Sequence, residues 1–141
     1  MKILAISFLF LLILGSCKSK EEIDPNSLVN KWLSTGQMQS KKADGTWSDW
    51  YVPQTFAAVI PSVWEFTKKG DFLRDGKAGG DCCFAGNKYS LSDKVITFSD
   101  PKICPTVDCG FICSTFKIDQ LKNDTLVLEQ CSTKNQFVRV K

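Results

Sequence analysis

The chain has 141 residues, with 18 Lys and Arg, 15 Asp and Glu and no histidine, and its formal net charge is +3. So small a charge gives no electrostatic reason to expect a nucleic-acid partner. Without histidine the chain lacks the commonest general base and the commonest zinc and haem ligand, so its composition speaks against an enzyme and against a bound metal or other cofactor.

The N-terminus has the features of an export signal. Lys2 precedes an almost entirely apolar stretch, residues 3–14, which is too short to cross a bilayer as a permanent helix. Directly after it, Leu14-Gly15-Ser16-Cys17 resembles the lipobox of bacterial lipoproteins. In that family a signal peptidase cleaves before the cysteine, whose sulfur then carries a diacylglycerol. The resemblance implies a signal peptide over residues 1–16 and a membrane anchor, with acyl chains such as palmitate, at Cys17. The alternative is an ordinary secretory signal with a chance cysteine.

The residues after Cys17 predict a tether and a destination. Residues 17–27 are polar, contain Pro25 and show no apolar periodicity, which is typical of a flexible linker. Within them, Lys20-Glu21-Glu22 resembles the signal that sends some Gram-negative lipoproteins to the outer face of the outer membrane. We therefore expect a lipid-anchored protein of the cell outer membrane, exposed at the cell surface if that signal is read. The remaining residues, 28–141, suffice for one folded domain, which we expect to be a monomer.

The first part of this domain shows a mixed pattern. Residues 28–40, which include Trp32, alternate enough to predict a first strand. Ala43-Asp44-Gly45 is a turn signal, and residues 46–52 predict a second strand that is unusually rich in aromatic side chains. The apolar residues 56–60 fit either a strand or a helix on pattern alone.

The rest of the domain predicts strands joined by tight turns. Gly70 lies in the turn of one expected hairpin, and Ser92-Asp93-Lys94 and Lys122-Asn123-Asp124 form the turns of two others. Strands are expected at residues 63–67, 71–74, 88–91, 95–98, 111–121, 125–131 and 136–140. No stretch after the signal has the periodicity of a long helix. The fold class is therefore all-β, an antiparallel barrel or sandwich of about eight short strands.

Several of these strands carry a family resemblance. The first opens with Trp32, a Trp-x-Phe-x-x-x-Gly-x-Phe hairpin spans residues 64–72, a Tyr-x-Leu hairpin begins at Tyr89, and Asn-Asp-Thr-Leu-x-Leu spans residues 123–128. Together they resemble the small lipocalin-like lipoproteins of Gram-negative bacteria. The resemblance implies an up-and-down β-barrel whose closed end is plugged by Trp32. Lipocalins proper favour a glycine two places before this tryptophan, where the chain has Asn30, so the looser lipocalin-like group fits better.

The cysteines predict a stapled domain, because disulfides persist in exported proteins. Besides Cys17 there are six: Cys82, Cys83, Cys104, Cys109, Cys113 and Cys131. An even number in a domain of this size indicates three disulfides. One alternative is a zinc site, which is disfavoured because the chain has no Cys-x-x-Cys pair and no histidine and the thiolates would need a reducing compartment. The other is a redox-active pair at Cys82 and Cys83.

One pairing follows from the expected register of the strands on either side of residues 122–124. A three-residue turn makes Leu121 face Thr125 and Ile118 face Leu128, which places Cys131 on the same outer face as Cys113. The pair Cys113–Cys131 is therefore favoured, although a bulge is needed to bring the two sulfurs within bonding distance. Cys82 and Cys83 are then left to Cys104 and Cys109 in either order.

The function depends on how full the barrel is. Alternation places large side chains on the inner faces: Trp64, Phe66, Phe72, Tyr89, Leu91, Ile96, Phe98, Phe116, Ile118, Leu126 and Leu128. So many of them favour a mostly filled barrel with a shallow cup at best. Trp47, Trp50 and Tyr51 are the candidate ligand-binding residues, on the rim of the open end, unless they simply belong to a core strand.

Two functions remain open at this point. One is a lipid-anchored, lipocalin-like envelope protein that holds a small apolar or amphipathic ligand. The other is a rigid, disulfide-stapled interaction module with a filled barrel that contacts another protein or a glycan. A cavity would favour the first, and a filled barrel with an exposed aromatic patch would favour the second. An enzyme is disfavoured because no nucleophile with a paired base is visible.

Overall fold

The computed structural model describes residues 23–54, 61–80, 82, 85–109 and 115–141. In this part of the chain nine strands form one antiparallel sheet, in the order β4-β3-β2-β1-β9-β8-β7-β6-β5. The strands are β1 (Lys31–Ser40), β2 (Val63–Phe66), β3 (Phe72–Arg74), β4 (Lys77–Ala78), β5 (Gly86–Ser92), β6 (Val95–Pro101), β7 (Thr115–Lys122), β8 (Thr125–Gln130) and β9 (Thr133–Arg139). Consecutive strands are neighbours throughout, except that β4 and β5 lie at opposite edges and β1 also pairs with β9.

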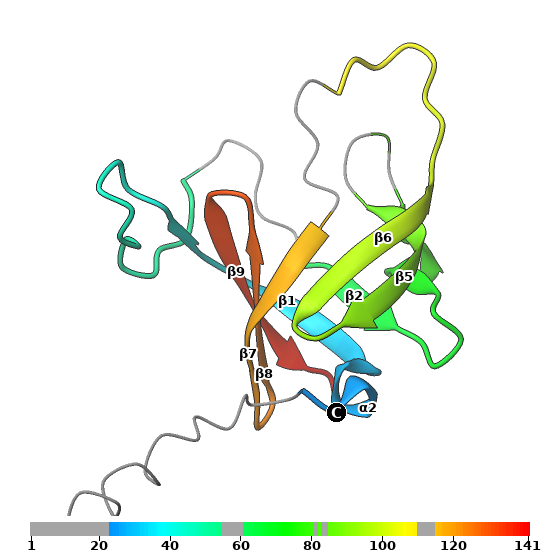
Figure 1. Ribbon diagram of the computed structural model, residues 1–141, viewed down its shortest axis with the longest axis horizontal. Helices are drawn as coiled ribbons and strands as arrows, with labels where there is room; N and C mark the ends of the chain where they lie inside the picture. Colours follow the sequence, from blue (N-terminus) through cyan, green and yellow to red (C-terminus); the bar gives the residue numbers. More distant parts are fainter. Residues whose placement is uncertain (1–22, 55–60, 81, 83–84, 110–114) are drawn as a thin grey trace, which may run out of the picture.

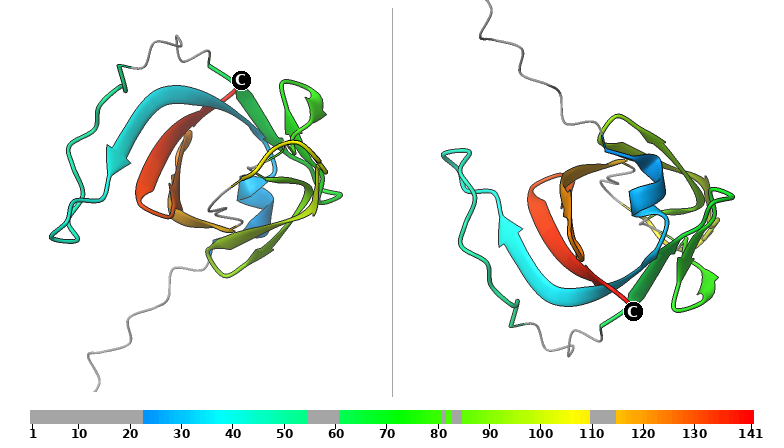
Figure 2. Two further views of the ribbon diagram at one scale, coloured as in Figure 1. Left: turned by 90° about the horizontal axis from the view of Figure 1, so that it is seen from above. Right: turned by 90° about the horizontal axis from the view of Figure 1, so that it is seen from below.

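The sheet curls into a barrel. Viewed along its axis, the strands form a ring, with the short helix α2 (Pro25–Leu28) at one end, which we call the base (Figures 1 and 2). The ring closes between β3 and the edge strand β5, where an isolated bridge between Asp71 and Lys88 takes the place of regular pairing. Next to it, the Tyr89 amide donates to the Gly70 carbonyl at 2.8 Å, and the Tyr89 hydroxyl donates to the Thr67 carbonyl at 2.8 Å. The predicted all-β, up-and-down barrel is thus confirmed, with this irregular seam (the seam hereafter) in place of a closed sheet.

The core fills the inside of the ring, because alternate residues of each strand point inward. Its buried members are Leu28, Trp32, Trp64, Phe66, Phe72, Ala85, Ile96, Phe98, Phe116, Ile118, Leu126, Leu128 and Phe137. The residues predicted to face inward are all buried here, apart from Tyr89 and Leu91, which are half-buried and pack against the cluster.

The register of β7 and β8 is partly as predicted. Ile118 faces Leu128, but Leu121 faces Leu126 instead of Thr125 because the register shifts between Ile118 and Gln120. The turn therefore contains two residues, Asn123 and Asp124, and Asn123 takes the positive φ of 55° that such a short hairpin turn requires.

The prediction of a second strand at residues 46–52 is wrong. This segment folds back on the end of β1 through two isolated bridges only, Lys41 to Trp47 and Met38 to Tyr51. In the turn that joins the end of β1 to this segment, Gly45 has a φ of 83° and the Asp44 carboxylate accepts from the Thr46 amide at 2.8 Å. The result is a two-stranded extension that projects from the barrel wall (Figures 1 and 2). We call residues 41–52 the aromatic ribbon.

The ordered domain also reaches further back than residue 28. Asp24 caps α2, and its carboxylate accepts from the Asn26 amide at 2.9 Å. Ile23 packs against the core and Leu28 is fully buried in it. Of the predicted tether, only residues 17–22 lie outside the described part of the chain.

Candidate functional site

The interior of the barrel is occupied by a network of aromatic rings. The Trp64 ring lies at its centre, with centroid distances of 5.4 Å to Phe72, 6.1 Å to Phe116 and 4.6 Å to Phe137. Phe98 continues the network, 5.0 Å from Phe72 and 5.2 Å from Phe116, with the rings edge to face. Edge-to-face packing of this kind is favourable and leaves little free volume. The space in which a lipocalin-like barrel would hold a ligand is therefore taken up by side chains.

The base is closed by Trp32, which is fully buried. Its indole nitrogen donates to the Leu28 carbonyl at 2.9 Å, so the ring is tied to the last residue of α2. The Arg139 guanidinium, from the neighbouring strand β9, lies 5.2 Å from the centre of the same ring. The expected position of Trp32 at the closed end agrees with this arrangement, whereas the sequence did not reveal the part played by Arg139.

Three depressions of the described surface lie around α2. One of about 210 Å³ is lined by residues including Ile23, Lys94 and Lys122. The others, of about 480 and 460 Å³, are open and share Pro25. All three lie outside the barrel, between α2 and the adjacent turns, so none is a ligand cavity within the ring of strands.

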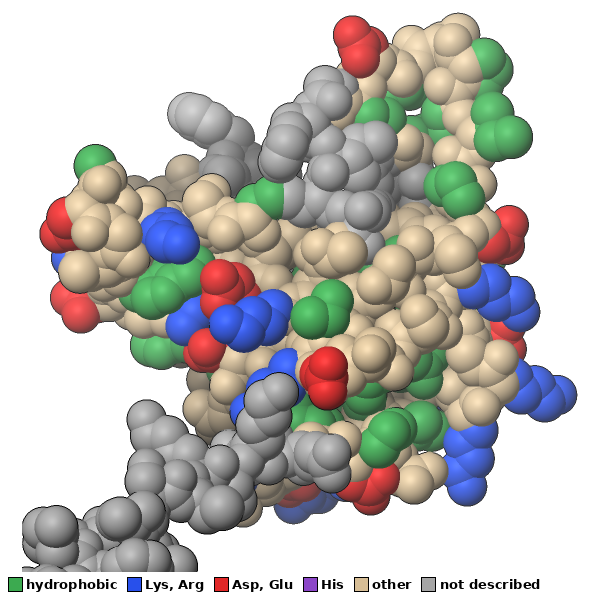
Figure 3. Space-filling model, viewed as in Figure 1, with side chains coloured by type: hydrophobic (Ala, Val, Ile, Leu, Met, Phe, Trp, Pro, Cys, Tyr) green, Lys and Arg blue, Asp and Glu red, His purple; other side chains and the backbone are tan. Residues whose placement is uncertain are grey.

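The aromatic ribbon places the three predicted ligand-binding residues on the outside of the barrel. It leaves β1 at the end opposite to the base, where the Lys41 amide donates to the Ser132 carbonyl in the β8–β9 turn at 2.8 Å. Trp50 and Tyr51 are 38% and 41% exposed, and Val52 is 56% exposed. On the left of Figure 3 the ribbon shows apolar side chains among charged ones. Trp50 and Tyr51 therefore belong to a surface, and not to a core strand.

Trp47, in contrast, attaches the ribbon to the barrel wall. Its half-buried ring lies 4.6 Å from the Lys134 ammonium and 5.8 Å from that of Lys41. Lys134 is largely buried and donates to the Asp119 carboxylate at 2.9 Å. The chain of contacts from Trp47 through Lys134 to Asp119 joins the ribbon to β9 and β7. Nothing in the sequence pairs these three residues, which are far apart along the chain.

The ribbon is also fixed along its length by hydrogen bonds. The Tyr51 hydroxyl and the Ser40 hydroxyl lie 2.6 Å apart, and the Met38 and Tyr51 backbones exchange bonds of 2.9 and 3.0 Å. The Gln39 side-chain amide donates to the Ser48 carbonyl at 2.7 Å. Trp50 and Tyr51 are thus exposed on a segment that is held in one conformation, which lowers the entropy lost when such a surface binds.

Three shifted pKa values lie together at the seam. The Lys88 ammonium donates to the Asp71 carboxylate, which lowers the pKa of Asp71 and raises that of Lys88. Burial of the Tyr89 ring, with the Asp71 charge as a second cause, raises the pKa of its hydroxyl. These groups hold β3 and β5 together at neutral pH.

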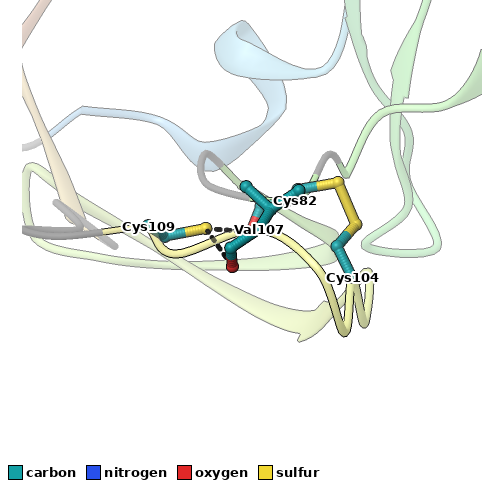
Figure 4. Close-up of a disulfide and its surroundings, with 4 residues drawn as sticks. All are labelled: Cys82, Cys104, Val107 and Cys109. Atoms are coloured by element: carbon teal, nitrogen blue, oxygen red, sulfur yellow. Dashed lines mark hydrogen bonds between the residues drawn. A yellow bond between two sulfur atoms is a disulfide. The ribbon is translucent and has the colours of Figure 1, made fainter.

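A disulfide joins Cys82 to Cys104, one of the two pairings that the sequence left open for Cys82. It ties the segment before β5 to the loop after β6 (Figure 4). In the same loop the Cys109 sulfur lies 2.7 Å from the Cys82 carbonyl oxygen. Cys109 and Cys131 each take part in a further disulfide. The stapled loop exposes Ile103, which is 88% accessible.

Some predicted residues lie outside the described part of the chain, namely Cys17, Cys83 and Cys113, and with them the pairing of Cys113 with Cys131. Among the described residues, no three Asp, Glu or Cys side chains are grouped so that they could hold a metal ion. In the same residues no helix is long and apolar enough to cross a membrane.

No protein-family model matches the chain, and no curated protein matches it either. Among solved structures, a lipocalin-like protein from Bacteroides uniformis ATCC 8492 is similar to this chain, with 26% sequence identity and a TM-score of 0.38. The similarity covers 81% of this chain and 99% of that one. A TM-score this low describes a loose superposition. The barrel and its surfaces are therefore defined by this chain's own strand pairing and contacts alone.

Proposed function

We propose that the chain is a lipid-anchored, lipocalin-like binding protein of the cell envelope that uses its filled barrel as a rigid scaffold and binds a partner protein through the aromatic ribbon. The observation that carries this proposal is the packed interior, where Trp64 contacts rings on three other strands. A barrel filled in this way favours binding on its outer surface over binding inside.

The ribbon has the properties of a protein-binding surface. Tryptophan and tyrosine are the residues most often found at the energetic centres of protein interfaces. Trp50, Tyr51 and Val52 are consecutive and all exposed, and the ribbon also carries the exposed charges of Lys42 and Asp49. An apolar centre with a charged border is the usual composition of such an interface.

The anchor is supported by the sequence before the domain. The lipobox-like residues end at Cys17, and Ile23 enters the domain six positions later. If Cys17 carries acyl chains, the barrel is held close to a membrane surface. Replacing Cys17 by Ser should remove the acyl chains and release the protein from membranes. Unchanged membrane retention, with no loss of labelled fatty acid, would contradict the anchor.

The carrier function is the main competitor, and native mass spectrometry separates the two. The protein purified from its own host should have the mass of its polypeptide and acyl chains alone. A small molecule of defined mass that stays bound would show that the barrel is a carrier and would overturn the scaffold.

The ribbon itself is tested by Trp50→Ala. In-cell crosslinking followed by mass spectrometry should identify one envelope protein, and its affinity for the purified chain should fall by about 1 kcal/mol or more in the variant. Val95→Ala is a matched control, because Val95 is 39% exposed but lies in the β5–β6 hairpin at the base. Equal affinities of Trp50→Ala and the wild type would place the binding surface elsewhere. Retention of a glycan in place of a protein would change the partner class.

A further inference from the structure

We infer that the base of the barrel lies against the membrane and binds the phosphate headgroups of anionic lipids through the lysines of its turns. This inference rests on the acyl anchor at Cys17 that the proposed function includes. It adds an orientation and a second membrane contact to that anchor.

The point where the chain enters the domain determines which end can face the membrane. Ile23 and Leu28 are packed into the base, and Asp24 caps α2 there. Between Cys17 and Ile23 lie five residues, so the link spans about 20 Å when fully extended. β1, which leads from the base to the opposite end, has ten residues and is about 30 Å long. So short a link cannot pass along the barrel, and the base must be the end nearer to the lipid.

Lysines surround this point of entry on three separate turns. Lys68 and Lys69 occupy the β2–β3 turn, Lys94 the β5–β6 turn and Lys122 the β7–β8 turn. Lys68 lines a depression together with Pro25, and Lys94 and Lys122 line another together with Ile23. The three turns therefore lie around α2 at the base, and Lys68, Lys69 and Lys122 are exposed there.

The carboxylates at the base offset only part of this positive charge. Asp124 lies 3.6 Å from the Arg139 Nε and 3.5 Å from the Lys141 ammonium, so it faces two cations of its own. Asp24 and Asp119 line the same depression as Lys94 and Lys122, but Asp119 also accepts from Lys134. Asp93, beside Lys94, offsets one charge.

The loop at the opposite end has the reverse balance, because it carries Asp100 and Asp108 against Lys102. Lysine is a compact point charge suited to phosphate, and clusters of lysines close to a bilayer are attracted to anionic lipids.

The test uses the mature, acylated protein reconstituted into vesicles of phosphatidylcholine, with or without phosphatidylglycerol. Exposed lysines are acetylated with an activated ester, and the extent at each position is read by peptide mass spectrometry. In the anionic vesicles Lys68, Lys69 and Lys122 should react more slowly than in detergent, while Lys42 and Lys102 react equally in both. Equal reaction of the two sets in vesicles would overturn the inference. Equal protection in neutral and anionic vesicles would overturn the role of the headgroup's net negative charge, because phosphatidylcholine also has a phosphate but is neutral overall.

Charge reversal provides a matched pair of variants. Lys68→Glu with Lys69→Glu should speed the acetylation of Lys122 in anionic vesicles about fivefold or more, because each lysine near an anionic surface contributes a factor of about five. Lys42→Glu with Lys102→Glu changes the net charge equally and should leave Lys122 protected. If the mature protein isolated from its own host carries no acyl groups at Cys17, the anchor and this inference are both overturned. An acylated, vesicle-bound chain with an unprotected base would overturn this inference alone.

Discussion

A single residue, Trp32 of β1, joins this strand to α2 and β9 at the base. It is fully buried, donates to the Leu28 carbonyl and lies under the Arg139 guanidinium. Trp32→Phe keeps an aromatic ring but leaves the buried carbonyl without its donor, which should lower the free energy of unfolding by about 2 kcal/mol. Urea denaturation without reductant measures this loss. Trp50→Phe, at an exposed position, should change the same quantity by less than about 0.5 kcal/mol. Equal effects of the two substitutions would mean that Trp32 does not tie α2 to the barrel.

At the scale of the elements, the seam between β3 and β5 determines how the stability of the barrel changes at acid pH. Because the pKa of Asp71 is lowered in the folded state, its contribution to stability is present above the ordinary value of 3.8 and is lost as the pH falls below it. Asp71→Asn should therefore lower the urea concentration at the midpoint of unfolding near pH 6. It should have little effect near pH 2, about two units below the ordinary pKa. Asp49→Asn, on the ribbon, should not show this dependence. If the stability of the wild type and of Asp71→Asn fell equally as the pH is lowered, the bridge from Asp71 to Lys88 would not be the source of the acid sensitivity.

The elements differ in how well the sequence predicts them, and the difference follows burial. Strands such as β6 and β7 were predicted because Ile96, Phe98, Phe116 and Ile118 alternate with exposed residues, and period-two burial is a local signal. The ribbon was mistaken for a barrel strand because its aromatic residues have the composition of a strand although they face solvent.

The sequence did not predict the contact of Trp47 with Lys134, and it left two possible partners for Cys82. The stack of Trp47 on Lys134 and the pairing of Cys82 with Cys104 join residues that are distant in sequence. No local pattern reports such contacts, which depend on how the sheet curls.

The disulfide between Cys82 and Cys104 acts on the molecule as a whole, because it closes a loop between residues 22 apart that includes the β5–β6 hairpin. Cys82→Ala with Cys104→Ala should lower the free energy of unfolding by about 3 kcal/mol, mainly because the unfolded chain gains conformational entropy when the loop is opened. Chemical denaturation without reductant measures it. The double variant should keep the far-ultraviolet circular dichroism of the wild type. Unchanged stability would mean that the unfolded chain is already confined by the other disulfides.

The pairing of β1 with β9 has a consequence for how this protein is made. The bond from the Thr35 hydroxyl to the Gln136 carbonyl joins residues 101 positions apart, and the two strands pair from Trp32 and Arg139 to Ser40 and Thr133. At synthesis rates of about 5–20 residues per second, β1 waits roughly 5–20 s for this partner. Until the last strand emerges, the growing chain cannot complete its barrel. On the route to the cell envelope that we propose for this chain, such a delay would leave it unfolded while it crosses the membrane.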